Sequence, residues 1–170
     1  MKRLGLAVGG VWLLSLAAAL FAQRSGTTAL VVNIAPEAHL NPAQVALQFR
    51  ISADGSSDIG SQSQEIAAWV RALPGRPIRL TASIAGFTGP SGTVPISALG
   101  WSGEPTRATA GGQAAACTSG SFGGGAPQDL VSGWTRSGTL ACRVAFSLAD
   151  PRSLTPGLYS GVVNLTLRAE

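Results

Sequence analysis

The chain has 170 residues, of which 12% are charged, and its 12 Lys and Arg against 8 Asp and Glu give a formal net charge of +4. This length suits one domain that is large enough to bury a core. The basic residues form no run and do not interleave with aromatic residues, so nothing indicates a nucleic-acid partner. The 22 glycines favour turns and strands over solvated helices.

The first segment of the chain has the pattern of a secretory signal peptide. Lys2 and Arg3 form a positive region, and the run Leu4–Leu20 is almost entirely apolar. We expect residues 1–22 to be removed during export, which leaves residues 23–170 as a single mature domain without a membrane span. The alternative is an uncleaved anchor, because the apolar run approaches the length that crosses a bilayer. In the first case the protein is secreted, periplasmic or at the cell surface.

Three stretches in the first half of the chain are predicted strands. Residues 28–34 are rich in β-branched residues and end at Ala35-Pro36. Residues 44–51 and 78–84 alternate between apolar and other side chains, which is the pattern of a strand with one buried face. We expect a turn at Asn41-Pro42, between the first two of these strands.

Residues 64–73 fit two patterns. The apolar residues that fall at helical spacing are Ile66, Trp69, Val70 and Leu73, and Ser61 and Gln64 are placed as a capping box. The same residues also fit a period of two. Because the neighbouring segments are predicted strands, we favour a strand here and keep the helix as the alternative.

The middle of the chain gives weaker patterns. Residues 93–101 alternate, and Pro95 among them indicates an edge strand. Residues 102–128 are mostly Gly, Ala, Ser and Thr and are too long for an ordinary connection. We expect either an irregular excursion pinned by Cys117 or a short strand between loops. Residues 130–134 add a brief predicted strand.

Two long alternating runs end the chain. Residues 139–148 and 158–168 each have apolar side chains at every second position, and turn dipeptides separate them. Gly161 is expected to allow a close backbone approach. With seven or eight short strands and frequent turns, the sequence predicts an all-β, antiparallel two-layer β-sandwich of immunoglobulin-like arrangement, with a barrel as the alternative.

An exported chain with two cysteines favours a disulfide. We expect Cys117 and Cys142 to be joined as a structural staple; the alternative is a pair of separate buried thiols. No CxxC pair is present, so nothing indicates a zinc or redox centre.

The sequence gives little support to catalysis. The one histidine, His39, lies beside Glu37 in a predicted polar turn, and no Gly-x-Ser-x-Gly motif accompanies it. Asp54 and Asp58 crowd one loop, but they lack the spacing of an EF-hand, and turn chemistry explains them equally well. We therefore predict no enzyme, no metal and no cofactor.

Three tryptophans of the mature chain are candidate binding residues. Trp69, Trp101 and Trp134 could stack on sugar rings if a sheet face exposed them together. The alternative is that one or two of them belong to the core between the sheets.

The end of the chain resembles that of bacterial fimbrial subunits with immunoglobulin-like folds. Gly157 is fourteenth from the C-terminus, and Val163, Leu165 and Leu167 occupy the eighth, sixth and fourth positions from it, as in chaperone-usher pilins. The penultimate residue, Ala169, departs from the aromatic residue of that family. The resemblance covers about fifteen residues and implies a secreted surface module.

Together these patterns predict a non-catalytic exported structural or adhesion module, with a fimbrial-like subunit as its most specific form. Such a module would bind a protein partner or assemble with itself, because a sheet edge carries unpaired backbone groups that another strand can complete. The alternative function is a carbohydrate-binding module that uses the exposed tryptophans. A missing edge strand would favour the first function, and a row of exposed tryptophans would favour the second.

Overall fold

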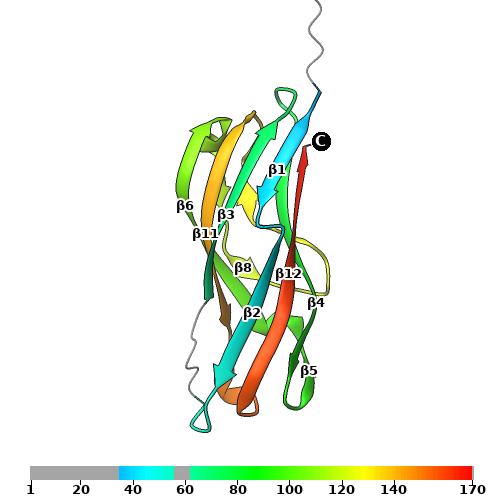
Figure 1. Ribbon diagram of the computed structural model, residues 1–170, viewed down its shortest axis with the longest axis vertical. Helices are drawn as coiled ribbons and strands as arrows, with labels where there is room; N and C mark the ends of the chain where they lie inside the picture. The colour runs from blue at the N-terminus through cyan, green and yellow to red at the C-terminus, as the bar shows by residue number, and fades with distance from the viewer. Residues whose placement is uncertain (1–34, 56–61, 170) are drawn as a thin grey trace, which may run out of the picture. The chain divides into compact units, whose positions relative to one another are not determined.

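Two antiparallel sheets pack face to face in the computed structural model, which describes residues 35–55 and 62–169 (Figure 1). These residues belong to one compact unit of the chain. They contain twelve strands and three short 3₁₀ helices, and none of these helices is long and apolar enough to cross a membrane. The predicted signal peptide, residues 1–22, and the predicted strand at 28–34 lie outside the described residues.

Sheet A has the strand order β1-β3-β11-β6-β8. Its strands are β1 (Glu37–Asn41), β3 (Gln62–Arg71), β11 (Gly138–Leu148), β6 (Leu99–Ala110) and β8 (Gly120–Ser121). Sheet B has the order β2-β12-β4-β5, and β9 also pairs with β4. Its strands are β2 (Gln44–Ile51), β12 (Gly157–Ala169), β4 (Ile78–Gly89), β5 (Gly92–Val94) and β9 (Gln128–Asp129). A short ribbon pairs β7 (Ala116–Cys117) with β10 (Val131–Ser132).

The predicted fold class, an all-β sandwich, is confirmed, although the described strands outnumber the seven or eight expected. Short strands of two or three residues, such as β7, β8 and β9, account for the excess. They make few backbone bonds and leave no alternating pattern that a sequence could display.

The core lies between the sheets and follows the predicted alternation. In β2 each second residue is buried, and in β12 the inner face from Tyr159 to Leu165 is buried while Ser160, Val162 and Thr166 are exposed. The largest fully buried side chains are Trp134, Tyr159, Phe49, Phe87, Phe122 and Phe146. The burial of one face per strand is what a period of two predicts.

Residues 64–73 form a strand for most of their length, as favoured from the sequence. β3 pairs with β11 from Gln62↔Phe146 to Val70↔Gly138, so its backbone groups bond to a neighbouring strand instead of to a helical turn. Ile66, Ala68 and Val70 point into the core. The helix alternative for this segment is therefore wrong.

The expectation of an irregular segment directly after Trp101 is wrong, because β6 continues to Ala110 and pairs with β11 along its whole length. Only Leu99 and Trp101 of this strand are buried. The outer part of β6 has almost no apolar residues, and a bulge at Thr106 follows Pro105. Backbone pairing with β11 holds these residues extended without a buried face, so the composition gave no strand signal.

The chain between β6 and β11 closes one side of the sandwich. β8 pairs with β6 of sheet A, β9 pairs with β4 of sheet B, and Phe122, Leu130 and Trp134 fill the space between them. The amide of Leu130 donates to the carbonyl of Leu80 at 2.8 Å. The segment after β6, which the sequence predicted as an irregular excursion, therefore covers one side of the core and contributes buried side chains to it.

The corner between β11 and β12 contains a buried tyrosine with a backbone partner. The hydroxyl of Tyr159, a residue that is 1% exposed, donates to the carbonyl of Thr155 at 2.6 Å. Its ring packs where Gly89 has no side chain, since a Cβ there would lie 2.1 Å from the ring. A tyrosine that bonds a few residues upstream at a crossing between sheets is a hallmark of immunoglobulin-like sandwiches.

Replacing Tyr159 with phenylalanine is expected to lower the free energy of unfolding by about 1 kcal/mol, because it removes this hydrogen bond and keeps the ring. Urea denaturation measures the change. The neighbouring Ser160→Ala, on the exposed face, serves as the control and should leave stability within about 0.5 kcal/mol of the parent. Equal midpoints for the two variants would contradict a role for the hydroxyl.

Candidate functional site

The predicted disulfide is present. Cys117 of β7 is bonded to Cys142 of β11, with the two Cα atoms 6.0 Å apart, and no described cysteine is free. Cys142 is fully buried on the inner face of its strand. Cys117 is half-buried and packs against the core. The bond therefore joins the lateral ribbon to sheet A at the edge of the core.

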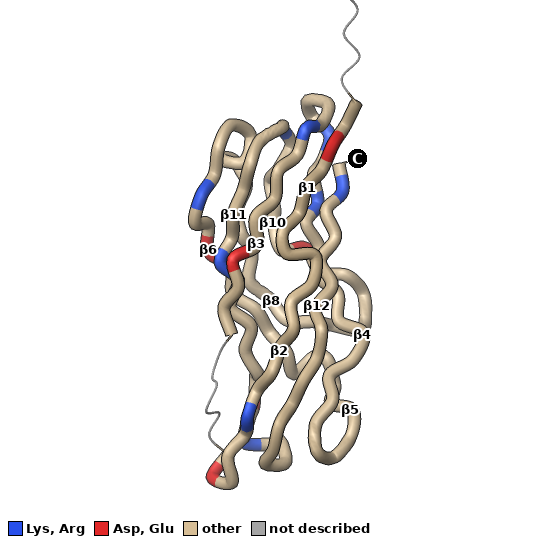
Figure 2. Tube along the Cα trace, viewed as in Figure 1, with Lys and Arg blue, Asp and Glu red and all other residues tan. Residues whose placement is uncertain are grey.

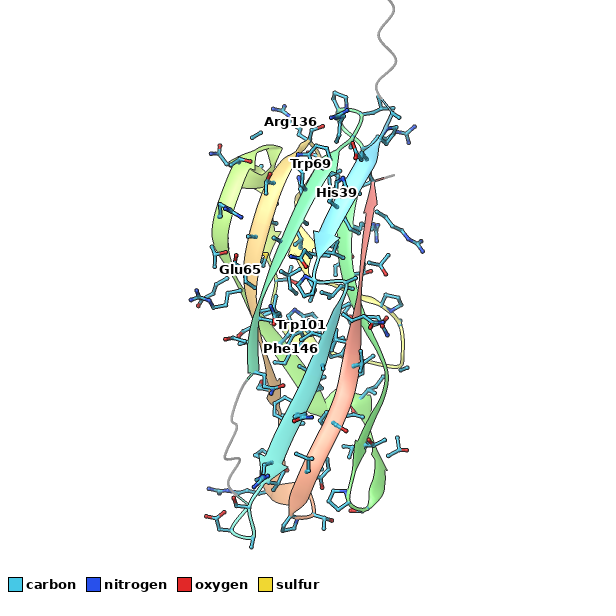
Figure 3. The ribbon with its side chains drawn as sticks, in the orientation of Figure 1. His39, Glu65, Trp69, Trp101, Arg136 and Phe146 are labelled. Carbon is cyan, nitrogen blue, oxygen red and sulfur yellow. A yellow bond between two sulfur atoms is a disulfide. The ribbon has the colours of Figure 1, made fainter. Side chains whose placement is uncertain are left out.

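The three candidate tryptophans do not form one surface. Trp101 and Trp134 are 6% and 1% exposed and lie in the core, whereas Trp69 lies on the outer face of sheet A (Figure 3). The indole N–H of Trp134 donates to the carbonyl of Arg136 at 2.8 Å, and the ring of Trp101 lies 5.0 Å from that of Phe122. The predicted sugar-binding row is thus reduced to one residue.

Trp69 has polar neighbours on its own sheet. His39 is its directly opposite residue on β1, with ring centroids 5.3 Å apart, and the guanidinium of Arg71 lies 5.5 Å from the indole centroid. A shallow hollow of about 250 Å³ borders the two rings. His39 belongs to a strand and not to the turn expected from the sequence, because β1 pairs with β3 from Glu37 to Asn41.

The surroundings of His39 do not form a catalytic arrangement. Its Nε2 lies 2.8 Å from the carboxylate of Glu37, and both side chains are well exposed, 67% and 49%. Within the described part of the chain no three His, Cys, Asp or Glu residues cluster as metal ligands would. Of the acidic pair in the predicted turn, Asp54 is described and Asp58 lies outside the described residues.

Among the described strands, the outer edge of sheet B is formed by β2, which pairs with β12 alone. The amide of Leu165 donates to the carbonyl of Ala43 at 2.9 Å, so odd-numbered residues direct their backbone groups toward β12. The amide of Gln48 instead donates to the side-chain Oε1 of Gln62 at 2.8 Å. Because these directions alternate along an antiparallel strand, the even-numbered residues of β2 direct their backbone groups outward. We call this row, Gln44, Ala46, Gln48 and Arg50, the β2 edge.

The outer strands β5, β6 and β9 have features that discourage pairing. The part of β6 beyond β8 contains Pro105, a bulge at Thr106 and the charged residues Glu104 and Arg107. β5 and β9 have three and two residues. Proline, bulges, charges and short length are the usual means by which proteins protect a sheet edge. β2 has eight residues, no proline and one charged side chain, Arg50.

An open groove of about 680 Å³ lies on the outer face of sheet B, next to the β2 edge. Its floor is the bulge where Val162 of β12 stands opposite both Ala85 and Gly86 of β4. Gly161 makes this approach possible, as expected from the sequence, because a Cβ there would lie 2.8 Å from the ring of Phe87. The lining side chains are uncharged; they are Gln44, Ala46, Leu47, Gln48, Ala85, Thr88, Ser160, Val162 and Asn164.

A missing edge strand would have favoured a structural or adhesion module. No strand is missing beside β12, because β2 occupies that position. β12 therefore has partners on both sides, β2 and β4.

Comparison of the chain with protein-family models, with curated proteins and with solved structures gives no match. The sequence predicted β2 as a strand but held no signal for its place at an edge, because edge position depends on which strands pair.

Proposed function

We propose that the protein is a non-catalytic structural or adhesion module of the cell envelope or extracellular space that binds a further β-strand along the β2 edge. The observation that carries the proposal is the outward direction of the backbone groups of β2, an eight-residue strand without proline or glycine. Main-chain hydrogen bonds to an added strand would supply affinity, and the uncharged groove beside the edge would receive its side chains.

The side chain of Gln62 occupies one of the groups that an added strand would need. It accepts the hydrogen bond of the Gln48 amide. An incoming strand would replace this side-chain acceptor with a backbone carbonyl. In the unbound protein, Gln62 thus satisfies the amide of Gln48. The sandwich, which the disulfide between Cys117 and Cys142 links internally, would give the exposed strand β2 a rigid support.

Replacing Ala46 with proline tests the proposal. Since its amide points away from β12, the substitution removes no bond of the sheet, and proline is tolerated on such edges. Proline does remove a donor that an added strand would use, and its ring obstructs approach. The test uses the chain from Gln23 onward, and sedimentation velocity over a concentration series measures its self-association. We expect Ala46→Pro to lower the association constant more than about tenfold.

Two further variants sharpen this experiment. Ala46→Thr keeps the amide and a strand-compatible side chain, so it should associate as the parent does. Gln62→Ala uncovers the amide of Gln48 and should strengthen association. A parent that stays monomeric at every concentration, or an Ala46→Pro variant that assembles normally, would contradict assembly through the β2 edge.

A further inference from the structure

One end of the sandwich gathers positive charge. The strands and turns at this end carry five exposed arginines, namely Arg71, Arg76, Arg79, Arg136 and Arg168. Figure 2 shows blue segments gathered at the end of the sandwich that lies next to the C-terminus. This is the end where β3 ends and β4 begins. Among the described residues, two acidic ones lie beside these arginines: Glu37 is opposite Arg71 on β1, and Asp129 lies 3.8 Å from Arg79. The described residues of this end therefore carry an excess of positive charge.

Backbone bonds hold part of this cluster in place. The amide of Gly75, in the turn between β3 and β4, donates to the carbonyl of Thr135 at 3.1 Å. This bond ties the turn that carries Arg76 to the loop that carries Arg136. The two guanidinium groups thus belong to adjoining segments that are fixed to each other.

An exposed leucine lies between two of these arginines in the chain. Leu73 is 58% exposed and precedes the turn, between Arg71 and Arg76 in the chain. It borders an open hollow of about 400 Å³ whose other walls include Pro36, Ala72 and Pro74. An exposed apolar side chain beside arginines suits the interface of an anionic membrane.

The opposite end of the sandwich differs in charge. Arg50 and Arg152 lie there with Asp54 and Asp150, so the positive and negative charges of the described residues balance. This end also has an exposed leucine, Leu158, at 52%. Charge distinguishes the two ends, whereas an exposed leucine does not.

The chain enters the described domain at the arginine-rich end. β1 begins there, so the apolar run at 4–20 is connected to this end through residues 21–34. A chain of that length reaches at most about 50 Å. In the alternative case of an uncleaved anchor, a bilayer entered by the apolar run would therefore lie within reach of the arginines.

We propose that the arginine-rich end binds the surface of an anionic bilayer, with Leu73 entering the headgroup boundary and Arg76 and Arg136 contacting lipid phosphates. Guanidinium groups suit this role because they are always charged and bond phosphate in a bidentate way. The contact is independent of the β2 edge and orients the sandwich so that its opposite end faces away from the membrane.

Co-sedimentation with vesicles tests this inference. The chain from Gln23 onward includes every core residue that the structure describes and lacks the apolar run. It should bind phosphatidylcholine vesicles that contain about 30 mol% phosphatidylglycerol, bind pure phosphatidylcholine weakly, and dissociate as salt is added. The double variant Arg76→Ser, Arg136→Ser should lower the partition coefficient about 25-fold, at about fivefold per arginine. Leu73→Ser should lower it roughly tenfold.

The opposite end supplies matched controls. Arg50→Ser with Arg152→Ser, and separately Leu158→Ser, make the same chemical changes outside the proposed surface and should leave vesicle binding unchanged. Equal losses for the variants of both ends, or no preference for anionic vesicles, would overturn the proposal. A melting temperature raised by inorganic phosphate through Arg76 and Arg136, without vesicle binding, would overturn it in favour of a soluble-anion site.

Discussion

Replacing Leu165 with alanine is expected to lower the free energy of unfolding by about 2–5 kcal/mol. Leu165 is 6% exposed on the inner face of β12 and pairs with Ala82 of β4. The substitution removes apolar contacts in a strand that is bonded to neighbours on both sides, so the backbone cannot easily move to fill the cavity. Chemical denaturation with guanidinium chloride measures the change from the shift in midpoint at constant slope.

The next residue along β12 provides the control for this prediction. Thr166 is exposed on the outer face and borders a hollow that Arg79 and Arg168 also line. Thr166→Glu places a negative charge beside these arginines, and we expect a change within about 0.5 kcal/mol. Unfolding of Leu165→Ala and Thr166→Glu at the same denaturant concentration would show that the alternation does not reflect burial. Strong sensitivity of both faces would instead indicate that a partner covers the outer face.

Removing the disulfide by Cys117→Ala and Cys142→Ala is expected to cost about 2–5 kcal/mol and to lower the melting temperature by about 5–15 °C. The bond joins residues 25 positions apart in sequence and attaches the β7–β10 ribbon to β11. Without it the lateral segment, which carries Phe122, Leu130 and Trp134, depends on short strands alone. Calorimetry of exported protein measures the effect.

A reductant separates loss of the bond from loss of the sulfur atoms. It should lower the melting temperature of the parent toward that of the double variant and leave the double variant unchanged. A parent protein that melts at the same temperature with and without reductant, while peptide mapping shows the reduced thiols, would contradict a stabilising role for the bond.

The β2 edge and the arginine-rich end can be tested independently. Ala46→Pro alters neither Arg76 nor Arg136, and serine at those arginines leaves β2 unchanged. Each set of variants is therefore a folding control for the other. Loss of strand association with intact vesicle binding, or the reverse, would assign the two activities to separate surfaces of one sandwich.

Local chemistry in the sequence determined the parts of the fold that depend on one strand at a time. The alternation in residues 44–51 and 158–168 predicted which side chains are buried, because successive residues of a strand point to opposite faces. The presence of two cysteines in a chain that we expect to be exported predicted the bond between Cys117 and Cys142. These features need only the period of the pattern and the chemistry of single residues.

Only the tertiary structure decided which strands lie side by side and hence which surfaces are open. β6 is held extended by its bonds to β11, so residues 102–110 form a strand although their side chains stay exposed. Trp101 and Trp134 are buried because the segment between β6 and β11 folds over the side of the core, and Trp69 is left outside. The edge position of β2 and the arginines gathered from separate turns likewise arise from antiparallel pairing between distant segments. Such pairing is made by backbone groups that every residue carries, so side-chain patterns along the sequence do not reveal it.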